Sequence, residues 1–186
     1  MISAGDFRPG MVVEMDGDLY AVVEFQHNKR GRGTAVVRAR VRSLRTGAIT
    51  ERTFMPEERF PQAYLERRRM QYLYRDGAHY VFMDQENYDQ LPLDPGLVGD
   101  GALYLKENSD ATVVFHEGRP IALELPNAVE LQVTETAPGV RGDTVAGGGK
   151  PARLETGAVV TVPFFVQQGD RVRVDTRSGV YLERVK

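Results

Sequence analysis

The sequence predicts an all-β protein made of small barrels. Runs rich in β-branched and aromatic residues recur at intervals of roughly 8 to 12 residues, which is typical of small all-β domains. Turn dipeptides separate these runs, and no regular alternation of strands with helices is visible. The predicted strands include 19–25, 34–44, 48–54, 79–83, 112–115 and 159–165.

The predicted turns support hairpins between these strands. Each turn contains a glycine, which adopts the positive φ that tight hairpins need without steric cost. The turn dipeptides are Asp16-Gly17, Thr46-Gly47, Asp76-Gly77, Glu117-Gly118 and Ser178-Gly179. A single short helical stretch is expected at 94–105, where the glycines argue against a long helix.

The chain is predicted to form three domains. Its 186 residues exceed the commonest size of one domain. Prolines interrupt the predicted strands at 56–61 and again at Leu125-Pro126-Asn127. The expected domains are therefore 1–63, 64–127 and 128–186. Domains this small are marginally stable alone, so contacts between neighbours should matter.

Composition excludes several classes of protein. The chain has no cysteine, so it has no disulfides or thiolate metal sites, and nothing indicates an oxidising compartment. The N-terminal residues lack the apolar segment of a signal peptide, and no stretch approaches the roughly 20 apolar residues of a membrane span. We expect a soluble cytoplasmic protein that does not contact membranes.

No enzyme or cofactor site is predicted. His27, His79 and His116 lie far apart without the spacing of metal ligands, and each is interpreted as a surface or half-buried imidazole. Acidic pairs such as Asp84 and Glu86 lack an accompanying nucleophile or base. We therefore expect no catalytic residue, no metal and no cofactor.

Charge is sorted along the chain. The formal net charge is only -2, and residues 64–127 carry 6 Lys and Arg against 11 Asp and Glu. No acidic residue lies between Glu24 and Glu51, although seven bases do. These bases are Lys29, Arg30, Arg32, Arg38, Arg40, Arg42 and Arg45. Seven unopposed bases in one hairpin favour binding of phosphate.

The basic hairpin has two parts. Alternation along a strand should turn Val37, Ala39 and Val41 inward, and Arg38, Arg40 and Arg42 outward. At the predicted tip, Gly31 and Gly33 flank Arg32, so the backbone can turn sharply and the guanidinium projects. The alternative is a solvated edge strand whose charges discourage aggregation.

Two other segments remain open to interpretation. The glycine-rich segment 142–151 does not match a phosphate-binding P-loop, because Gly148 stands where a lysine is required; taken alone, it is interpreted as a linker. Tyr72, Tyr74, Tyr80 and Phe82 recur with period two and could stack bases, although an ordinary β core is favoured.

Sequence motifs along the whole chain resemble bacterial elongation factor P. The C-terminal third holds the most specific of them. They are Asp6-Phe7-Arg8-Pro9-Gly10, the 29–33 tip, Val140-Arg141-Gly142-Asp143-Thr144, 149–152, 154–158, 162–166 and 174–181.

The resemblance implies an SH3-like or KOW-like N-terminal barrel followed by two OB-fold barrels, in an L shape that mimics tRNA. It also implies a monomer that binds the 70S ribosome between the P and E sites, contacts peptidyl-tRNA and relieves stalling at consecutive prolines. The ribosome remains the catalyst. The alternative function is a general single-stranded RNA-binding OB protein that acts away from the ribosome.

The resemblance assigns site residues by position. Arg32 would contact the CCA end of peptidyl-tRNA, supported by Lys29, Arg30, Gly31 and Gly33. The charge pattern, rather than the resemblance, assigns Arg38, Arg40 and Arg42 to RNA phosphates. The Gly142-Asp143-Thr144 loop would approach the exit-site codon, which displaces the linker interpretation.

The tip departs from a common pattern of the family. Many members have Lys-Pro-Gly-Lys-Gly, and this chain has arginine at the second and fourth of these positions. Lysylation is therefore not expected. Rhamnosylation by a partner enzyme, another modification and an unmodified Arg32 all remain open.

Overall fold

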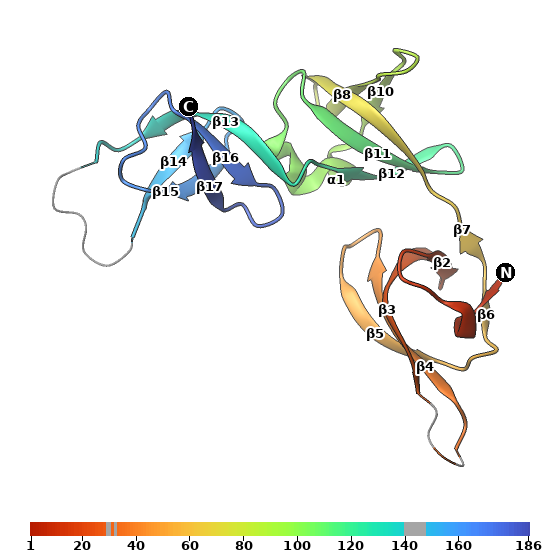
Figure 1. Ribbon diagram of the computed structural model, residues 1–186. Helices are drawn as coiled ribbons and strands as arrows, with labels where there is room; N and C mark the ends of the chain where they lie inside the picture. Colours follow the sequence, from red (N-terminus) through yellow and green to blue (C-terminus); the bar gives the residue numbers. More distant parts are fainter. Residues whose placement is uncertain (29–30, 32, 140–147) are drawn as a thin grey trace. The chain divides into compact units, whose positions relative to one another are not determined.

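The computed structural model describes residues 1–28, 31, 33–139 and 148–186, and within this part of the chain almost all regular structure is β. The strands there form three five-stranded sheets and one two-stranded sheet (Figure 1). The all-β prediction is confirmed. By internal contacts the chain divides into two compact units, Met1–Arg67 with Val114–Ala122, and Arg68–Val113 with Leu123–Lys186. The three domain ranges inferred from sequence, and the L shape, stay predictions.

The first sheet has the order β5-β4-β3-β2-β7. Its strands are β2 (Val12–Met15), β3 (Asp18–Asn28), β4 (Val36–Ser43), β5 (Ile49–Phe54) and β7 (Gln62–Ala63). Nearby, β1 (Ile2–Ser3) pairs with β6 (Arg59–Phe60), and the 3-10 helix η1 (Ala4–Asp6) follows β1. A tight turn joins β2 to β3 with positive φ at Asp16 and Gly17, as the sequence predicts.

An aromatic cluster closes the core of the first sheet. Phe7 follows η1, is fully buried, and its ring lies 5.5 Å from that of Phe54 in an edge-on contact and 5.8 Å from that of Phe60. Val37 and Val41 of β4 are buried in the same core. The segment after β1 thus fills one end of this core and is held there by aromatic packing; we call it the aromatic plug.

The second sheet has the order β10-β9-β8-β11-β12. Its strands are β8 (Glu66–Asp76), β9 (His79–Asp84), β10 (Gln90–Leu93), β11 (Asp110–His116) and β12 (Arg119–Glu124). The predicted helical stretch is confirmed as two short pieces, α1 (Pro95–Val98) and the 3-10 helix η2 (Gly99–Tyr104).

The period-two aromatics are mainly core residues. Tyr72 and Phe82 are buried, with ring centres 5.4 Å apart, and burial raises the pKa of Tyr72. Tyr74 is 45% exposed, because a register shift between Tyr72 and Tyr74 breaks the alternation of β8. The prediction of an ordinary β core is right for Tyr72 and Phe82, and Tyr74 departs from it.

The third sheet has the order β15-β14-β13-β16-β17. Its strands are β13 (Ala128–Thr136), β14 (Lys150–Leu154), β15 (Val159–Val162), β16 (Arg171–Asp175) and β17 (Tyr181–Val185). The inward residues form one apolar core that includes Leu131, Leu154 and Val172. Strict alternation of buried and exposed residues in β14 shows how each strand presents one face to this core.

Contacts within the second unit join η2 to the third sheet. The hydroxyl of Thr156 donates to the carbonyl oxygen of Leu103 at 2.5 Å, and the Lys106 ammonium lies 3.3 Å from the Glu155 carboxylate. Tyr104 packs against the apolar core of the third sheet. These contacts explain why the two segments form one compact unit.

In the described residues, no helix has the length and apolar character that a membrane crossing requires.

Replacing Phe7 with alanine tests the aromatic plug. Removing a fully buried ring should lower the free energy of unfolding by about 3–5 kcal/mol, because it removes apolar contact and leaves a cavity. Phe165→Ala is the control, since Phe165 is 57% exposed. Denaturant titration measures both, and equal small effects would contradict the role given to Phe7.

Candidate nucleic-acid interface

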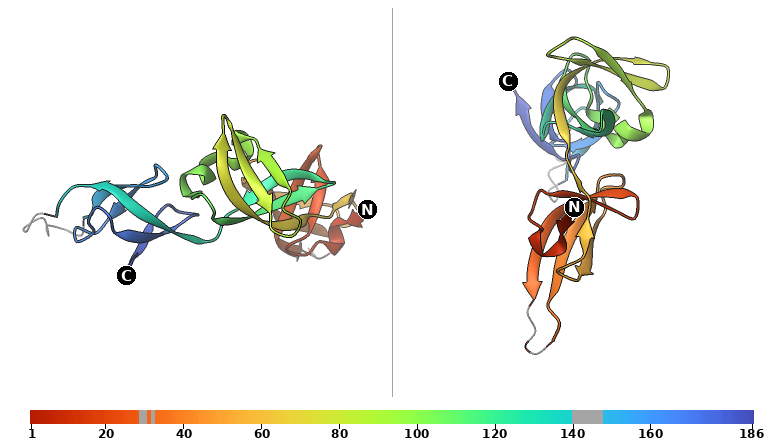
Figure 2. Two further views of the ribbon diagram at one scale, coloured as in Figure 1. Left: turned by 90° about the horizontal axis from the view of Figure 1, so that it is seen from above. Right: turned by 90° about the vertical axis from the view of Figure 1, so that its right-hand side faces the viewer.

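A two-stranded arm extends from the first sheet. Cross-strand pairs join β3 to β4 from Tyr20 and Ser43 as far as Asn28 and Val36. Pairing between β4 and β5 ends at Val37, which pairs with Phe54 near the start of β4. Beyond Val37 the described pairing continues for one more pair, Asn28 with Val36, which involves β3 and β4 alone (Figures 1 and 2).

The predicted tip is described only in part. Gly31 lies in a turn with φ +32°, and Gly33 lies in a bend. Lys29, Arg30 and Arg32, which the sequence singles out, lie outside the described residues.

The predicted row of outward-facing arginines is present on β4, and we call it the arginine ladder. Val37, Ala39 and Val41 are buried, whereas Arg38, Arg40 and Arg42 are exposed on the opposite face. The alternation of the strand therefore places the three guanidinium groups on one outer surface, as predicted.

The neighbours of these arginines differ from rung to rung. Arg40 lies between Glu24 of β3 and Glu51 of β5, and its guanidinium is 3.2 Å from the Glu24 carboxylate. Arg38 lies between Gln26 and Thr53. Only Arg40 of these two has acidic cross-strand neighbours.

Arg42 resembles Arg38 in this respect. It lies between Ala21 and Ile49, so its cross-strand neighbours are uncharged. We define Arg38 and Arg42 as the open rungs of the ladder and Arg40 as the closed rung. The open rungs present cations that no cross-strand carboxylate neutralises.

The prediction of seven unopposed bases is wrong for two of them. Arg40 pairs with Glu24, and Arg45 binds Asp18 through two nitrogens at 3.0 and 3.2 Å. The hydrogen bond to Asp18 raises the pKa of Arg45. Antiparallel pairing brings these acids to the bases although they lie outside the basic stretch in sequence. The charge pattern along the chain therefore overstates the positive charge in space.

A brace holds the root of the arm. The Nε2 atom of His27 lies 3.2 Å from the carbonyl oxygen of Gly5, and the amide of Gly5 donates to the Pro56 carbonyl at 2.9 Å. His27 lies on the last rung that β5 covers, opposite Val37. The contact thus ties the arm to the segment that follows β1, at the point where pairing with β5 ends.

Two further side chains complete this brace. The rings of Phe25 and His27 meet edge-on at 5.2 Å, and the Arg8 guanidinium lies over the Phe25 ring at 5.3 Å. Arg8 also donates to the Phe7 carbonyl at 2.6 Å. Sequence reasoning missed these roles, because no spacing pattern connects Arg8 with residues on β3.

The second predicted contact segment joins β13 to β14. Gly142, Asp143 and Thr144 lie outside the described residues, but both ends of the segment are described. A Cβ atom on Gly139 would lie 2.5 Å from the Phe164 carbonyl oxygen, and one on Gly149 would lie 2.5 Å from that of Val162. Only glycine allows this close approach of backbone.

A buried lysine also lies at this loop root. Lys150 is 5% exposed, and its ammonium donates to the carbonyl oxygen of Ala137 across the two strands. A hydrogen bond from a charged group is stronger than a neutral one. The two ends of the segment are therefore fixed against each other.

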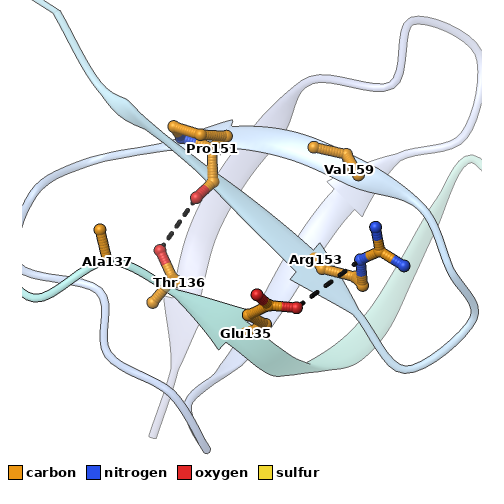
Figure 3. A pocket seen from close by; sticks show the side chains of 6 residues that line it. All are labelled: Glu135, Thr136, Ala137, Pro151, Arg153 and Val159. Carbon is orange, nitrogen blue, oxygen red and sulfur yellow. Dashed lines mark hydrogen bonds and ion pairs between the residues drawn. The ribbon is translucent and has the colours of Figure 1, made fainter.

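A shallow pocket lies beside the loop root (Figure 3). It has a volume of about 420 Å³. The Thr136 hydroxyl donates to the Pro151 carbonyl oxygen at 3.0 Å, and a dashed line in Figure 3 marks this hydrogen bond. The Arg153 guanidinium faces the Glu135 carboxylate at 3.9 Å. Among the described residues that line the pocket, one cation and one acid balance each other, so these residues give it little electrostatic attraction for phosphate.

The part of the chain that the structure describes contains no cluster of side chains suited to hold a metal ion. Its notable features are instead an exposed basic arm and a braced loop root.

Each sheet matches a known family model. Residues 3–60 match the elongation factor P KOW-like domain, residues 65–123 match the elongation factor P OB domain, and residues 129–184 match the elongation factor P C-terminal model.

Relatives match over the full chain. Elongation factor P of Desulforudis audaxviator is 57% identical over 99% of this chain and 100% of its own length. That of Pelotomaculum thermopropionicum is 54% identical over 100% of both. The fold and these matches define a translation elongation factor with KOW-like and OB domains. The chain belongs to the elongation factor P family.

Solved structures support the fold. Translation initiation factor 5A from Methanococcus jannaschii matches with a TM-score of 0.50 and 20% identity, covering 66% of this chain and 92% of that one. At this identity the match concerns the fold alone.

Replacing His27 tests the brace. His27→Leu removes the ring nitrogen that contacts Gly5, so hydrogen exchange of the Asn28 and Val36 amides should accelerate several-fold. These two residues pair beyond the end of β5, and two paired strands alone are marginally stable. His27→Gln, which keeps a donor of similar reach, should retain most protection. Equal protection in wild type and His27→Leu would contradict the brace.

Proposed function

We propose that this elongation factor binds the 70S ribosome between the P and E sites, contacts peptidyl-tRNA and stimulates peptide bond formation at consecutive prolines. The observation that carries the proposal is the braced basic arm of a chain in the elongation factor P family. Such an arm suits a role in which the hairpin tip reaches the end of peptidyl-tRNA while other surfaces bind the ribosome.

The chemistry of proline explains why such a factor is needed. The proline ring fixes φ, and its nitrogen attacks as a hindered secondary amine. Attack geometry then limits the rate, and a misplacement of about 1 Å can cost on the order of 100-fold. A factor that orients the end of peptidyl-tRNA accelerates the reaction without supplying a catalytic group, so the ribosome remains the catalyst.

Arg32 is the residue that we assign to the CCA end, with Lys29, Arg30, Gly31 and Gly33 as its support. The brace at His27 supports this assignment, because a tip orients a substrate only if the root of its arm is fixed. The chemical form of Arg32 in the cell, rhamnosylated, otherwise modified or bare, is part of the proposal to be tested by intact mass.

The ladder of β4 would hold the first domain on RNA phosphates. The sequence assigns all three arginines to phosphates, and their cross-strand neighbours now rank their expected contributions to phosphate binding. Arg38 and Arg42 offer a guanidinium without a cross-strand acid. Arg40 would have to leave Glu24, so it should contribute least.

The C-terminal domain would reach the exit-site codon through Gly142, Asp143 and Thr144. The glycine and lysine contacts at the loop root support this role, since they fix where the segment starts and ends. We further propose that the factor acts in the cytoplasm as a monomer and adopts the tRNA-like L shape on the ribosome.

The alternative, a single-stranded RNA-binding protein that acts off the ribosome, has less support. It rests on the basic hairpin and on period-two aromatic residues that could stack bases, but of these aromatics Tyr72 and Phe82 are buried in the core and Tyr74 is exposed. Tight binding to free oligonucleotides, without cosedimentation with ribosomes, would favour the alternative.

Arg32→Ala should abolish relief of stalling on a Pro-Pro-Pro message in reconstituted translation, because it removes the group that reaches the CCA end. Circular dichroism should stay unchanged, since Arg32 falls in the sequence between Asn28 and Val36, which form the last described pair of the hairpin. If the variant relieves stalling as well as wild type, Arg32 does not have this role.

The open rungs should dominate ribosome binding. In Arg38→Ala and Arg42→Ala, the slope of log affinity against log salt should fall by about 0.7–0.9 for each lost phosphate contact. Arg40→Ala is the matched control on the same face of the same strand, and its slope should change little. A similar fall in all three variants would contradict the ranking.

A further inference from the structure

A basic cleft lies on the C-terminal sheet. Its volume is about 610 Å³, and it is bordered by Gln132 in the middle of β13, by the start of β16, by the end of β17 and by the turn before β16. Its charged residues are Asp170, Arg171, Arg184 and Lys186. Three cationic side chains against one acidic side chain give the cleft a positive side-chain balance.

Cross-strand neighbours distinguish two arginines on the outer face of β16. Arg173 lies between Glu130 and Glu183 and forms ion pairs with both, at 2.9 Å to Glu130. These pairs raise the pKa of Arg173. Arg173 is therefore a closed rung in the sense defined for β4.

Two residues away on the same face, Arg171 lies between Gln132 and Val185. Neither neighbour carries charge, and Arg171 is exposed at the border of the cleft. Arg171 is therefore an open rung, and its guanidinium is available to a phosphate.

The acid in the cleft is already engaged. The Asp170 carboxylate accepts a hydrogen bond from the Gln167 amide at 2.9 Å and lies 3.6 Å from the Arg184 guanidinium. Asp170 therefore partly neutralises the positive charge of Arg184. Arg171 and Lys186 have no ion pair shorter than 4 Å to a described residue.

An exposed aromatic ring lies next to the cleft. Phe165 is 57% exposed, and Arg184 lies over its ring at 5.1 Å. Cations beside an exposed ring are the combination with which proteins bind unpaired nucleotides, the cations to phosphate and the ring to a base. An acidic peptide would use the cations but would gain little from the ring.

We propose that this cleft is a second RNA-contact site, in which Arg171 binds a phosphodiester of an unpaired RNA segment and Phe165 lies against a base. The proposal rests on the proposed function, because a ribosome-bound factor meets such RNA. The pocket beside Arg153 is a weaker candidate for phosphate, since Glu135 balances Arg153 among the described residues that line it.

The test compares two arginines of one strand. In Arg171→Ala, ribosome affinity should fall and the salt slope should decrease by about 0.7–0.9. Arg173→Ala removes the same formal charge from the same face and should leave the slope unchanged. Equal slopes for the two variants would overturn the proposal, because they would indicate a general effect of net charge.

A photocrosslinker identifies the partner. Gln132→p-benzoylphenylalanine places the probe beside Arg171 without removing a cation. Crosslinks on the ribosome should form to RNA, whereas crosslinks to ribosomal protein only, or none, would overturn the proposal. Relief of stalling by wild type is a separate readout, so failure of the proposed function would be distinguished from failure of this site.

Discussion

Cross-strand register is the constraint on which the charged surfaces of this protein depend. Each exposed arginine of a strand meets one residue on either neighbouring strand, and these neighbours decide whether its charge is neutralised. Arg40 and Arg173 lie between pairs of glutamates, whereas Arg38 and Arg171 lie between uncharged residues. The same rule thus operates in the first and the third sheet, and it selects the cations that no cross-strand carboxylate neutralises.

The constraint also links the core to the surface. Because side chains alternate, burying Val37, Ala39 and Val41 requires Arg38, Arg40 and Arg42 to face outward together. His27, which pairs with Val37 from the neighbouring strand β3, contacts Gly5 and ties this end of the hairpin to the N-terminal segment. Core packing and the display of charge on β4 are therefore set by one register.

Sequence predicted the features that depend on local pattern. Alternation placed the arginines of β4 outward, Asp16-Gly17 marked a tight turn, and 94–105 proved helical in two short pieces. Pairing partners could not be predicted in this way, because they depend on how distant strands align. Hence Glu24 and Asp18 seemed remote from the basic stretch, and neither the brace at Gly5 nor the open rung at Arg171 had a sequence signal.

A cryo-electron microscopy structure of the factor on a ribosome stalled at consecutive prolines tests the central claim most directly. The account predicts that the guanidinium groups of Arg38 and Arg42 lie within about 3 Å of RNA phosphate oxygens, as charge-assisted hydrogen bonds require, while Arg40 remains paired with Glu24. An Arg40 that has left Glu24 for a phosphate, with Arg38 and Arg42 facing solvent, would contradict it.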